Sequence, residues 1–555
     1  MVLEDKGLFF IPLGGSEQFS VNLNVYVCDG RLLAVDCGMG FADEQFPGID
    51  LLLPDPTFLE ENREELEGLI ITHAHEDHIG AVAHLWPRFE CPIYCTPFTA
   101  AVLEKKLEEA KIRHAEVNII EPFDQIKSGP FSVQPLPVSH SVPDACALLI
   151  ETRYGRVVHS GDWNLDPNPV VGYRSDAKTF KEAAKKGILA YIGDSTNANI
   201  DGRSGSERDV EKGLAEEFKN CPGRIFVTTF SSNVGRLISI ARAAQKVGRK
   251  AVVVGRSMHS MIGAAYDCQY MKNVPDFISE ENMDDYPDNK LVIIATGSQG
   301  EGRAVMSRIA RGDFPDISTR TTDTVIFSAR AIPGNEIKIN EVKNNFSAAG
   351  IKVIGPKDTA NVIHVSGHPC REEIVEMYQW LRPKIVVPVH GEHTQLQAQA
   401  DLAQANQIPQ IVLPRNGSVI RLAPGQAEIV DHIPTQLLAV DLKRIIPANH
   451  LSIVQRRKLQ YTGVVHITVV LDSRGELVSE PKINTIGLID PDDMAEEQFI
   501  GTLHEEVIDL LEDMGEDEIR DDHFVTEELR IGIRRFVHHF LGIKPAANIH
   551  VVRVP

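Results

Sequence analysis

The sequence lacks any long apolar run. No stretch of about 18 apolar residues occurs in the chain, so no membrane span is expected. Of its 555 residues, 43% are hydrophobic and 24% are charged, the balance of an ordinary globular protein. The first residues, Met-Val-Leu-Glu-Asp-Lys, place acids where a signal peptide would carry a basic region before an apolar stretch. We therefore expect a cytoplasmic protein without a membrane partner.

The cysteines lack a pairing pattern. The 8 cysteines are scattered, and the closely spaced Cys91 and Cys95 have no second pair with which to form a disulfide framework or a zinc knuckle. A reducing compartment fits this usage. Low-complexity tracts and internal repeats are also missing. At roughly 100–200 residues per domain, the length predicts about three domains.

Positive charge is in deficit. There are 56 Lys and Arg residues against 78 Asp and Glu residues, which gives a net charge of −22. This deficit disfavours broad adhesion to nucleic acid, because such binding is driven by basic side chains and counterion release. It does not exclude a narrow, metal-lined channel, since charges on distant faces are screened beyond about 10 Å at moderate salt.

One short segment carries a definite metal-binding pattern. Residues 69–80 read as an apolar strand that leads directly into His73-x-His75-x-Asp77-His78. A loop leaving a strand tip aims these side chains in two directions, so we expect two adjacent metal ions. Neutral imidazole and carboxylate suit zinc, and a catalytic zinc keeps one position open for water. Two such ions generate a strong nucleophile from water near neutral pH.

Three later segments offer further ligands at the ends of apolar stretches. His140 lies in Pro-Val-Ser-His-Ser-Val-Pro, where the prolines end a strand and favour an ordered turn. Asp162 follows Val-Val-His-Ser-Gly, and Gly161 would let the backbone come close. His390 ends the apolar segment Lys-Ile-Val-Val-Pro-Val. A lone histidine is more often a satisfied core or surface residue than a ligand, so these positions gain weight only together with the first motif.

With these residues and Asp36, which ends Leu-Leu-Ala-Val-Asp, the chain resembles the metallo-β-lactamase superfamily. The resemblance implies an αββα sandwich and two zinc ions per chain, with manganese or magnesium as substitutes. Asp162 would bridge both ions, and Asp36 would orient a ligand imidazole through its free N–H. The remaining ligands implied for the two ions are His73, His75 and His140 for one, and Asp77, His78 and His390 for the other.

The texture of the chain indicates how this domain is divided. Residues 8–36 read as strands joined by turns such as Asp29-Gly30, a hairpin signal. From about residue 210, apolar strands alternate with amphipathic helices, which predicts a parallel sheet covered on both faces. Since His390 must return to the metals, this α/β domain is an insertion.

The last part of the chain reads differently. The basic stretch Gln-Arg-Arg-Lys near residue 456 resembles a connector. Residues 460–555 then predict a hairpin, two amphipathic helices and a final strand, which is a small α/β domain. The acidic run at 515–522 is most simply a solvated loop.

Further motifs resemble the β-CASP group, the nucleic-acid-processing branch of the superfamily. They are Tyr-Ile-Gly-Asp194, Val-Ile-His364-Val-Ser366-Gly367-His368, and Pro-Val-His390-Gly. The resemblance implies that Asp194 pairs with His368, which contacts the scissile phosphate and protonates the leaving oxygen. Asp77 joins them among the implied catalytic residues. The alternative for His364 and His368 is a loop or helix-start decoration.

The resemblance narrows to the ribonuclease J family and covers essentially the whole chain. It is carried by Phe-Pro-Gly-Ile-Asp50, Thr-Phe-Ser231-Ser-Asn233, Ala-Thr-Gly-Ser-Gln-Gly-Glu301 and Ile-Pro-Gly-Asn-Glu336. It implies 5′-to-3′ exonuclease and endonuclease activity on RNA in messenger decay and ribosomal RNA maturation. It also implies a homodimer or homotetramer, with partners in an RNA-degradation complex. The predicted boundaries are 1–208 and 361–449 for the metallo-β-lactamase domain, 209–360 for the β-CASP insert, 450–460 for a linker and 461–555 for the C-terminal domain.

One segment departs from the family pattern. The family usually has Leu-Gly-Gly-x-x-Glu-Ile-Gly-Lys-Asn near its start, whereas this chain has Leu-Gly-Gly-Ser-Glu-Gln-Phe-Ser-Val-Asn22. The second glycine and the lysine are missing. Because these residues shape a loop and are not ligands, the departure bears on substrate fit and not on metal binding.

Polar residues at two strand ends predict a pocket for a 5′-monophosphate. Hydroxyls, an amide and strand-tip N–H groups form phosphate donors without much positive charge, at the usual ligand edge of a parallel sheet. Single-stranded RNA with a 5′-monophosphate end would then be the preferred substrate. The candidate residues are Ser231, Ser232, Asn233, His364, Ser366, Gly367 and His368.

Two other functions remain open. A small-molecule hydrolase of the same sandwich, such as a lactonase or thioesterase, would not need Asp194 and His368. A catalytically inactive β-CASP scaffold that binds RNA would be expected to lose ligands, and here every expected ligand is present. Serine hydrolysis is discarded because no nucleophile elbow occurs. The glycine-rich segment 297–302 lacks the ending of a P-loop, so a strand-to-helix connection is the simpler interpretation.

Overall fold

The computed structural model describes residues 6–490 and 494–555. The N-terminal residues 1–5, on which the expected absence of a signal peptide rests, lie outside this range. The chain forms two compact units. The larger comprises the chain up to Phe41 together with Leu52–Leu437, and the smaller comprises Ala42–Leu51 and Leu438–Pro555. No helix of the described residues combines the length and apolarity needed to cross a bilayer.

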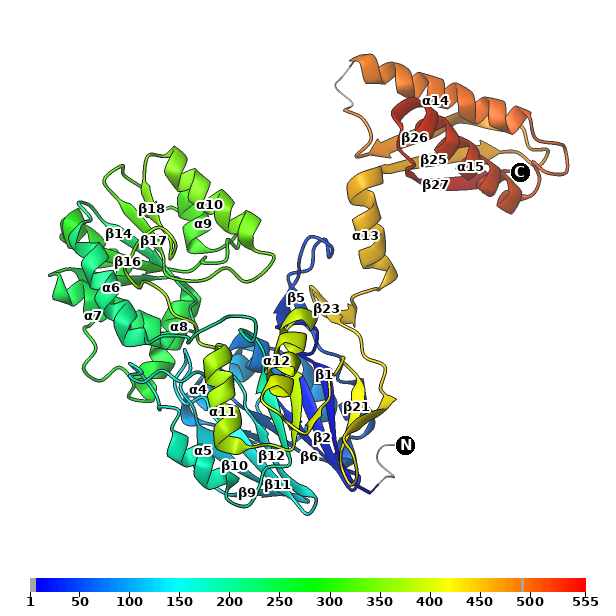
Figure 1. Ribbon diagram of the computed structural model, residues 1–555. Helices are drawn as coiled ribbons and strands as arrows, with labels where there is room; N and C mark the ends of the chain where they lie inside the picture. The colour runs from blue at the N-terminus through cyan, green and yellow to red at the C-terminus, as the bar shows by residue number, and fades with distance from the viewer. Residues whose placement is uncertain (1–5, 491–493) are drawn as a thin grey trace. The chain divides into compact units, whose positions relative to one another are not determined.

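The larger unit is built around two facing sheets (Figure 1). Apolar side chains from the inner faces of both sheets form one buried cluster, which includes Phe10 and Tyr26 from the first sheet and Leu148 and Ile192 from the second. The first sheet has the strand order β22-β21-β1-β2-β3-β6-β7-β8. Its strands are β1 (Leu8–Gly14), β2 (Leu23–Cys28), β3 (Arg31–Val35), β6 (Leu66–Ile71), β7 (Ile93–Cys95), β8 (Val117–Ile119), β21 (Ser418–Ala423) and β22 (Glu428–His432).

The second sheet has the strand order β20-β19-β13-β12-β11-β10-β9. Its strands are β9 (Ile126–Ser128), β10 (Phe131–Pro137), β11 (Cys146–Thr152), β12 (Gly155–His159), β13 (Ala190–Asp194), β19 (Ile385–Val389) and β20 (Gln410–Ile411). The strands β12, β13 and β19 are parallel neighbours. The chain that joins β13 to β19 contains the whole insert, so these two neighbouring strands lie on opposite sides of the insert in the sequence.

Helices cover the outer faces of this sandwich, as the resemblance implied. Three of them pack on the second sheet: α5 (Ala177–Ala184), α11 (Arg371–Leu381) and α12 (His393–Ala405). In the first sheet, α3 (Val82–Phe89) and α4 (Pro97–Glu109) connect parallel strands, which requires such crossovers. The predicted hairpin turn is also confirmed, since Asp29 (φ 51°) and Gly30 (φ 83°) are both left-handed.

The insert is a parallel sheet covered by helices on both faces, as its alternating texture predicts. Its strand order is β15-β16-β14-β17-β18. The strands are β14 (Ile225–Thr228), β15 (Lys250–Val254), β16 (Leu291–Ala295), β17 (Thr324–Phe327) and β18 (Lys352–Ile354). One face packs against α6 (Glu207–Lys219), α7 (Val234–Lys246) and α8 (Arg256–Asp267). The other packs against α9 (Val305–Arg311) and α10 (Glu336–Ala348), and the glycine-rich segment 297–302 is the connection between β16 and α9.

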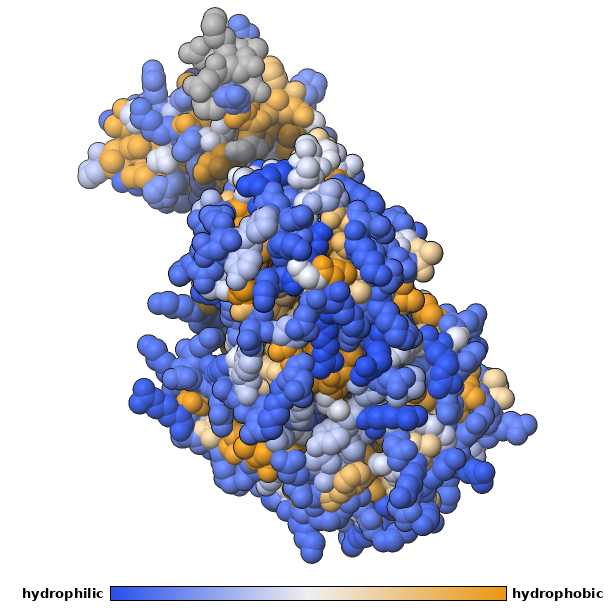
Figure 2. Space-filling model, turned by 90° about the vertical axis from the view of Figure 1, so that its left-hand side faces the viewer, coloured by the Kyte–Doolittle hydropathy of each residue, from blue (hydrophilic) through white to orange (hydrophobic). Residues whose placement is uncertain are grey.

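The smaller unit contains the predicted hairpin, helices and final strand. Its sheet has the order β26-β25-β27, and one buried cluster joins it to α14 and α15. The elements are β23 (Leu438–Asp441), β24 (Arg444–Pro447), α13 (Leu451–Thr462), β25 (Val464–Leu471), β26 (Leu477–Ile486), α14 (Met494–Glu512), α15 (Asp522–Leu541) and β27 (Ala546–Arg553). The predicted linker 450–460 is therefore largely helix α13, whereas the acidic run 515–522 is a loop up to the start of α15, as expected. On the face seen in Figure 2, apolar surface gathers on this unit.

Candidate metal centre

The ligand-type residues lie at strand tips and helix starts. β6 ends at Ile71, and His73 and His75 follow it directly before the short helix α2 (Glu76–Ile79), which carries Asp77 and His78. His140, Asp162 and His390 follow the ends of β10, β12 and β19. Gly161 has φ 53°, and a Cβ there would lie 3.1 Å from Thr72 Cβ, which explains the glycine before Asp162.

The structure brings the seven predicted ligands together in two overlapping groups. The first ligand set is His73, His75, His140 and Asp162, and the second ligand set is Asp77, His78, Asp162 and His390. Within each set, one ligand atom per residue lies within 4.8 Å of all the others. In the first set, His75 Nδ1 is 3.1 Å from His73 Nε2 and 3.0 Å from His140 Nε2.

The other ring nitrogen of each histidine has a partner. This arrangement fixes the ring orientation and leaves one nitrogen directed at the centre of its set. The Oδ2 of Asp36 lies 2.8 Å from His78 Nδ1. Three of the partners were missed by the sequence analysis: Thr72 Oγ1, 3.0 Å from His73 Nδ1; Ser141 Oγ, 3.1 Å from His75 Nε2; and Asn22 Oδ1, 3.1 Å from His390 Nδ1. His140 Nδ1 lies 2.8 Å from the carbonyl oxygen of Gly367.

Asp162 supplies the test of whether metal ions fit. Its side chain is 2% exposed, and among the described residues neither carboxylate oxygen has a hydrogen-bond partner. Oδ1 lies 3.3 Å from His78 Nε2 and 3.5 Å from His390 Nε2, while Oδ2 lies 3.5 Å from His73 Nε2. A buried, unpartnered carboxylate is costly. Divalent cations on either side would satisfy both oxygens, so the donor set fits two ions with Asp162 between them.

The electrostatics of the first ligand set favour the metal-binding form of its imidazoles. Burial lowers the pKa of His75 to about 3, and the neighbouring His140 acts in the same direction. Burial also lowers the pKa of His140 to about 4, against the opposing charge of Asp162. Both rings are therefore neutral at pH 7, as metal ligation requires. In the second set burial opposes protonation of His78, but the charges of Asp162 and Asp77 hold its pKa well above the usual value.

His368 and Asp194 form a pair beside these sets. His368 Nδ1 lies 2.9 Å from Asp194 Oδ2 and 3.8 Å from Asp162 Oδ2. Burial lowers the pKa of His368, but the charges of Asp194 and then Asp162 outweigh it and raise the pKa to about 9. Asn197 steadies the loop, since its Nδ2 donates to Ser366 Oγ at 2.8 Å and to His368 O at 3.2 Å. Asp162, Asp194, His368 and His390 also qualify as a third group with metal-binding geometry.

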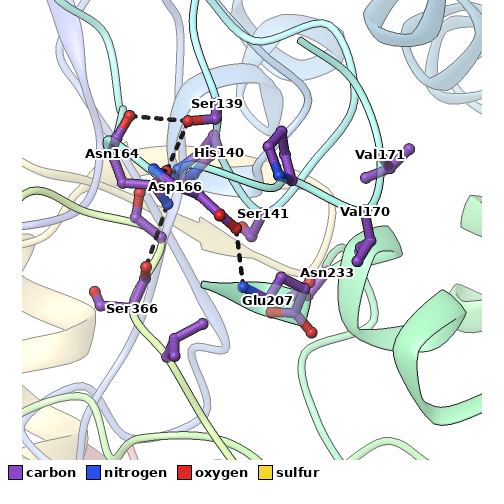
Figure 3. A pocket seen from close by; sticks show the side chains of 14 residues that line it. Ser139, His140, Ser141, Asn164, Asp166, Val170, Val171, Glu207, Asn233 and Ser366 are labelled. Carbon is purple, nitrogen blue, oxygen red and sulfur yellow. Dashed lines mark hydrogen bonds between the residues drawn. The ribbon is translucent and has the colours of Figure 1, made fainter. Parts of the chain in front are cut away.

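A pocket next to His140 contains part of the predicted phosphate site. Asn233, Ser366 and Gly367 are among its lining residues, and Figure 3 labels Asn233 and Ser366. Ser231 and Ser232 lie half-buried in the turn before α7 and do not line it. His364 does not line it either, and its Nδ1 lies 3.2 Å from the buried guanidinium of Arg236.

The carboxylates that line this pocket already have donors. Asp166 Oδ2 accepts from the backbone N–H of Glu207 at 2.8 Å, as Figure 3 shows. Glu207 is paired with Arg236 at 2.7 Å. The pocket also lies at the N-terminus of α7, where the helix dipole favours an anion, although the first backbone N–H groups of the helix already donate to Ser232 O, Ser141 O and Asn233 Oδ1. An anionic group therefore meets neutralised carboxylates there.

Comparison with known proteins finds four family models that match successive parts of the chain. Family models match residues 31–177 (beta-lactamase superfamily domain), 222–346 (ribonuclease J, beta-CASP domain), 357–414 (Zn-dependent metallo-hydrolase RNA specificity domain) and 451–554 (ribonuclease J C-terminal domain). A solved structure, titled as a protein of unknown function from Enterococcus faecalis V583, aligns with 75% of this chain and 100% of its own at a TM-score of 0.53. Its sequence is 16% identical, so it shows a shared fold alone.

Curated relatives match over nearly the whole chain. Ribonuclease J of Sinorhizobium meliloti is 41% identical over 99% of this chain and 98% of its own length. Ribonuclease J of Synechocystis is 37% identical over 88% of this chain and 76% of its own, and that of Thermus thermophilus is 35% identical over 83% and 82%. The full-length similarity, the four family matches and the metal-ligand geometry agree: this chain belongs to the ribonuclease J family.

Proposed function

We propose that this protein is a ribonuclease that hydrolyses RNA phosphodiester bonds with two metal ions, zinc by donor type, and with manganese or magnesium as substitutes. It would act both as a 5′-to-3′ exonuclease and as an endonuclease, in messenger decay and ribosomal RNA maturation. The observation that carries the proposal is the buried carboxylate of Asp162 between two histidine sets, since neither of its oxygens has a hydrogen-bond partner among the described residues. The family matches supply the substrate class.

The metal ions would generate the nucleophile from water and neutralise charge on the phosphate oxygens. The chain's own residues do the rest. Asp162 holds both ligand sets at one separation, and Asp77 completes the second. The carboxylate of Asp194, 2.9 Å from His368 Nδ1, favours the protonated form of this imidazole. His368 can therefore donate a proton to the leaving oxygen, while Asp194 fixes which ring nitrogen faces the substrate.

The pocket beside His140 would select the 5′ end. Ser366 Oγ accepts from Asn197 Nδ2 and from the backbone N–H of His368, so its own hydroxyl hydrogen is directed to neither. That hydrogen is a donor available to a phosphate. With Asn233 and the start of α7 on the opposite side, the pocket would hold a 5′-monophosphate and set the first linkage at the metals. Ser231, Ser232 and His364 would then act from just outside it.

The same family membership supports the wider setting. We place the protein in the cytoplasm as a homodimer or homotetramer, acting on single-stranded RNA, with partners in RNA-degradation complexes. The boundaries proposed for its domains are 1–208 and 361–449, 209–360, 450–460, and 461–555.

The test combines metal analysis with digestion of 5′-labelled RNA. We expect two ions per chain and release of labelled mononucleotide from a 5′-monophosphorylated strand. After chelation, both the bound ions and this release should be lost. Cleavage of a generic thioester or lactone without cleavage of RNA would favour the small-molecule hydrolase. Tight RNA binding by the metal-loaded protein without cleavage would favour the inactive scaffold.

A further inference from the structure

The loop between β1 and β2 lies against one half of the metal centre. Asn22, at its end, is 2% exposed. Its Nδ2 donates to Asp77 O at 2.9 Å, and its backbone N–H donates to the same oxygen at 3.2 Å. Its Oδ1 lies 3.1 Å from His390 Nδ1. Since an amide oxygen only accepts, His390 Nδ1 must carry the proton, which leaves Nε2 free to bind a metal. One side chain thus fixes two members of the second ligand set.

The rest of this loop also contacts His390. The backbone N–H of His390 donates to Gly15 O at 2.7 Å. The ring of Phe19 meets the imidazole edge to face at a centroid distance of 6.5 Å. Gly391, the next residue, forms isolated β-bridges with Ser16 and Gln18. Besides the substrate fit expected from its departing residues, this loop therefore contacts a metal-ligand residue directly.

The backbone conformation shows how firmly the loop is held. Val21 has φ 56°, a left-handed conformation that is an outlier for a β-branched residue, and His390 also has φ 56°. Such strain persists only where the surroundings enforce it. Val21 is fully buried, and a Cβ at Gly14 would lie 2.0 Å from Val21 O. The loop can therefore take this path only because glycine precedes it.

The first ligand set has its own, separate support. Ser141 Oγ lies 3.1 Å from His75 Nε2. In the described part of the chain, Asn22 makes no hydrogen bond to His73, His75 or His140. The two metal positions thus depend on different neutral side chains, one from the loop before β2 and one from the loop after β10.

We propose that Asn22 is a positioning residue for the metal bound by Asp77, His78, Asp162 and His390, and that it leaves the other metal position unaffected. This rests on the proposed two-metal function. Removing the amide removes both the acceptor that keeps the proton of His390 on Nδ1 and the side-chain hydrogen bond to Asp77 O. The affinity for the metal at this one position should therefore fall. Outer-shell partners of this kind typically change metal affinity by about 10–100-fold.

The experiment is a metal titration of the full-length protein. Calorimetry measures the affinity of each ion, and elemental analysis measures the number of ions bound per chain. Asn22→Ala should weaken one of the two bound ions by about 10–100-fold and leave the other unchanged. Ser141→Ala should weaken one ion as well. Combining Asn22→Ala with His390→Ala should add little further loss, whereas combining it with His140→Ala should weaken both positions.

Each contrary outcome is specific. Equal weakening of both ions by Asn22→Ala, or no weakening, overturns the assignment. If Asn22→Ala melts at a much lower temperature, Asn22→Gln keeps the amide but displaces it by one methylene and should give the same selective loss. A wild-type protein that binds two ions and cleaves RNA keeps the proposed function intact whatever Asn22 does. A wild type that binds fewer than two ions contradicts the proposed function itself.

A separate observation concerns Arg330, which follows β17 at the carboxyl edge of the insert's sheet. Its side chain is exposed, and within the described residues it forms no ion pair. Its Nη1 lies 3.2 Å from Asn197 Oδ1, and Asn197 holds Ser366 and the backbone of His368. By contrast, Arg224, Arg236 and Arg320 of the same domain are paired with carboxylates.

The segment that carries Arg330 is fixed by the glycine-rich loop. Gln299, 4% exposed, donates from Nε2 to Arg330 O at 2.9 Å. Its Oε1 accepts from the backbone N–H of Ile332 at 2.8 Å. The segment 297–302 is thus more than a strand-to-helix connection, since it holds the arginine segment in place.

We infer that Arg330 binds a phosphate of the RNA strand next to His368. This deepens the proposed ribonuclease function. An exposed guanidinium without a carboxylate partner, in a chain of net charge −22, matches the geometry and charge of a phosphate. It reaches the catalytic loop through one neutral amide, so a phosphate bound there would lie close to the reacting linkage.

The test is steady-state cleavage of 5′-monophosphorylated RNA over a range of salt concentrations. Arg330→Ala should raise KM much more than it lowers kcat. The slope of log kcat/KM against log salt should fall by about 0.7, the value for one phosphate contact on a single strand. Arg330→Lys should keep most of the slope, and Arg208→Ala, an exposed arginine of α6, should change neither quantity. An unchanged KM and slope in Arg330→Ala would overturn the inference, whereas a wild type that does not cleave RNA would contradict the proposed function.

Discussion

All residues of the first ligand set precede the insert in the sequence, whereas the second ligand set combines residues that precede the insert with one that follows it. His73, His75, His140 and Asp162 all precede residue 163, in segments that follow the ends of β6, β10 and β12. The second set needs His390, which follows β19 after the entire insert, and it is braced by Asn22 near the start of the chain. Metal binding in the second set is therefore coupled to correct folding of the insert.

The partners of the histidines repeat this contrast. Thr72 is the immediate neighbour of its partner His73, and Ser141 lies 66 residues from its partner His75, whereas Asn22 lies 368 residues from His390. The carbonyl of Gly367 is the exception, because it ties His140 of the first set to the loop that carries His368. His368, the proposed general acid, therefore lies in a loop that contacts the first set.

Replacing Asp162 tests what the two sets share. Asp162→Ala removes a ligand from both positions and leaves two cations without the carboxylate between them, so both should weaken together and turnover should be abolished. His140→Ala and His390→Ala serve as controls, since each should weaken one position more than the other. Elemental analysis and RNA digestion would measure this. Two retained ions with normal cleavage in Asp162→Ala would show that the ligand assignment is wrong.

Replacing His368 separates the sets from the proposed acid. His368→Ala should keep both metals and RNA binding while the rate falls about 10²–10⁴-fold, the usual contribution of general acid catalysis. The competing possibility is the third group of Asp162, Asp194, His368 and His390, in which His368 is itself a ligand. Loss of an ion from His368→Ala would favour that group and contradict the acid role.

The pH dependence of the rate tests the pairing of His368 with Asp194. The acid must be protonated, so the rate should fall as pH rises through its pKa. Because the charge of Asp194 raises that pKa, Asp194→Asn should move the descending limb to lower pH. Asp201→Asn, at a side chain 98% exposed, should leave the profile unchanged. A limb that stays in place in Asp194→Asn would assign it to another group.

Much of this centre could be predicted from the sequence because its ligands end apolar strands. A local pattern, an apolar strand followed closely by a ligand-type side chain, marks the motif that begins at His73 and the residues His140, Asp162 and His390. The glycine at 161 belongs to the same pattern. The turn at Asp29-Gly30 is equally local. These features need no knowledge of which strands lie side by side.

The remainder depends on tertiary contacts that leave little local signal. Asn22 and Ser141 are neutral side chains in ordinary loops, and only the folded chain shows that they meet His390 and His75. Helix α13 was predicted as a linker for a related reason. In that helix only Ile453 is buried, so the apolar periodicity that marks a packed helix is absent from its sequence.

The smallest expected effect concerns the 5′ end, where the pocket uses neutral donors. We expect 5′-monophosphorylated RNA to be degraded to mononucleotides much faster than 5′-triphosphorylated RNA, since a pocket that holds one phosphate would not accommodate the larger and more highly charged group. Ser366→Ala removes the hydroxyl proposed to donate to the phosphate, and should narrow the difference without loss of metal. Ser347→Ala, on the exposed side of α10, is the matched control.

Rates on the two substrates should be compared with metals saturating, by release of mononucleotide from each end type. Ser366 lines the pocket and Ser231 does not, so Ser231→Ala should narrow the preference less than Ser366→Ala. A larger effect at Ser231 would move the phosphate toward the turn before α7. Equal exonucleolytic rates on the two RNAs in the wild type would refute the pocket, and endonucleolytic cleavage would then be the activity that the metal centre supports.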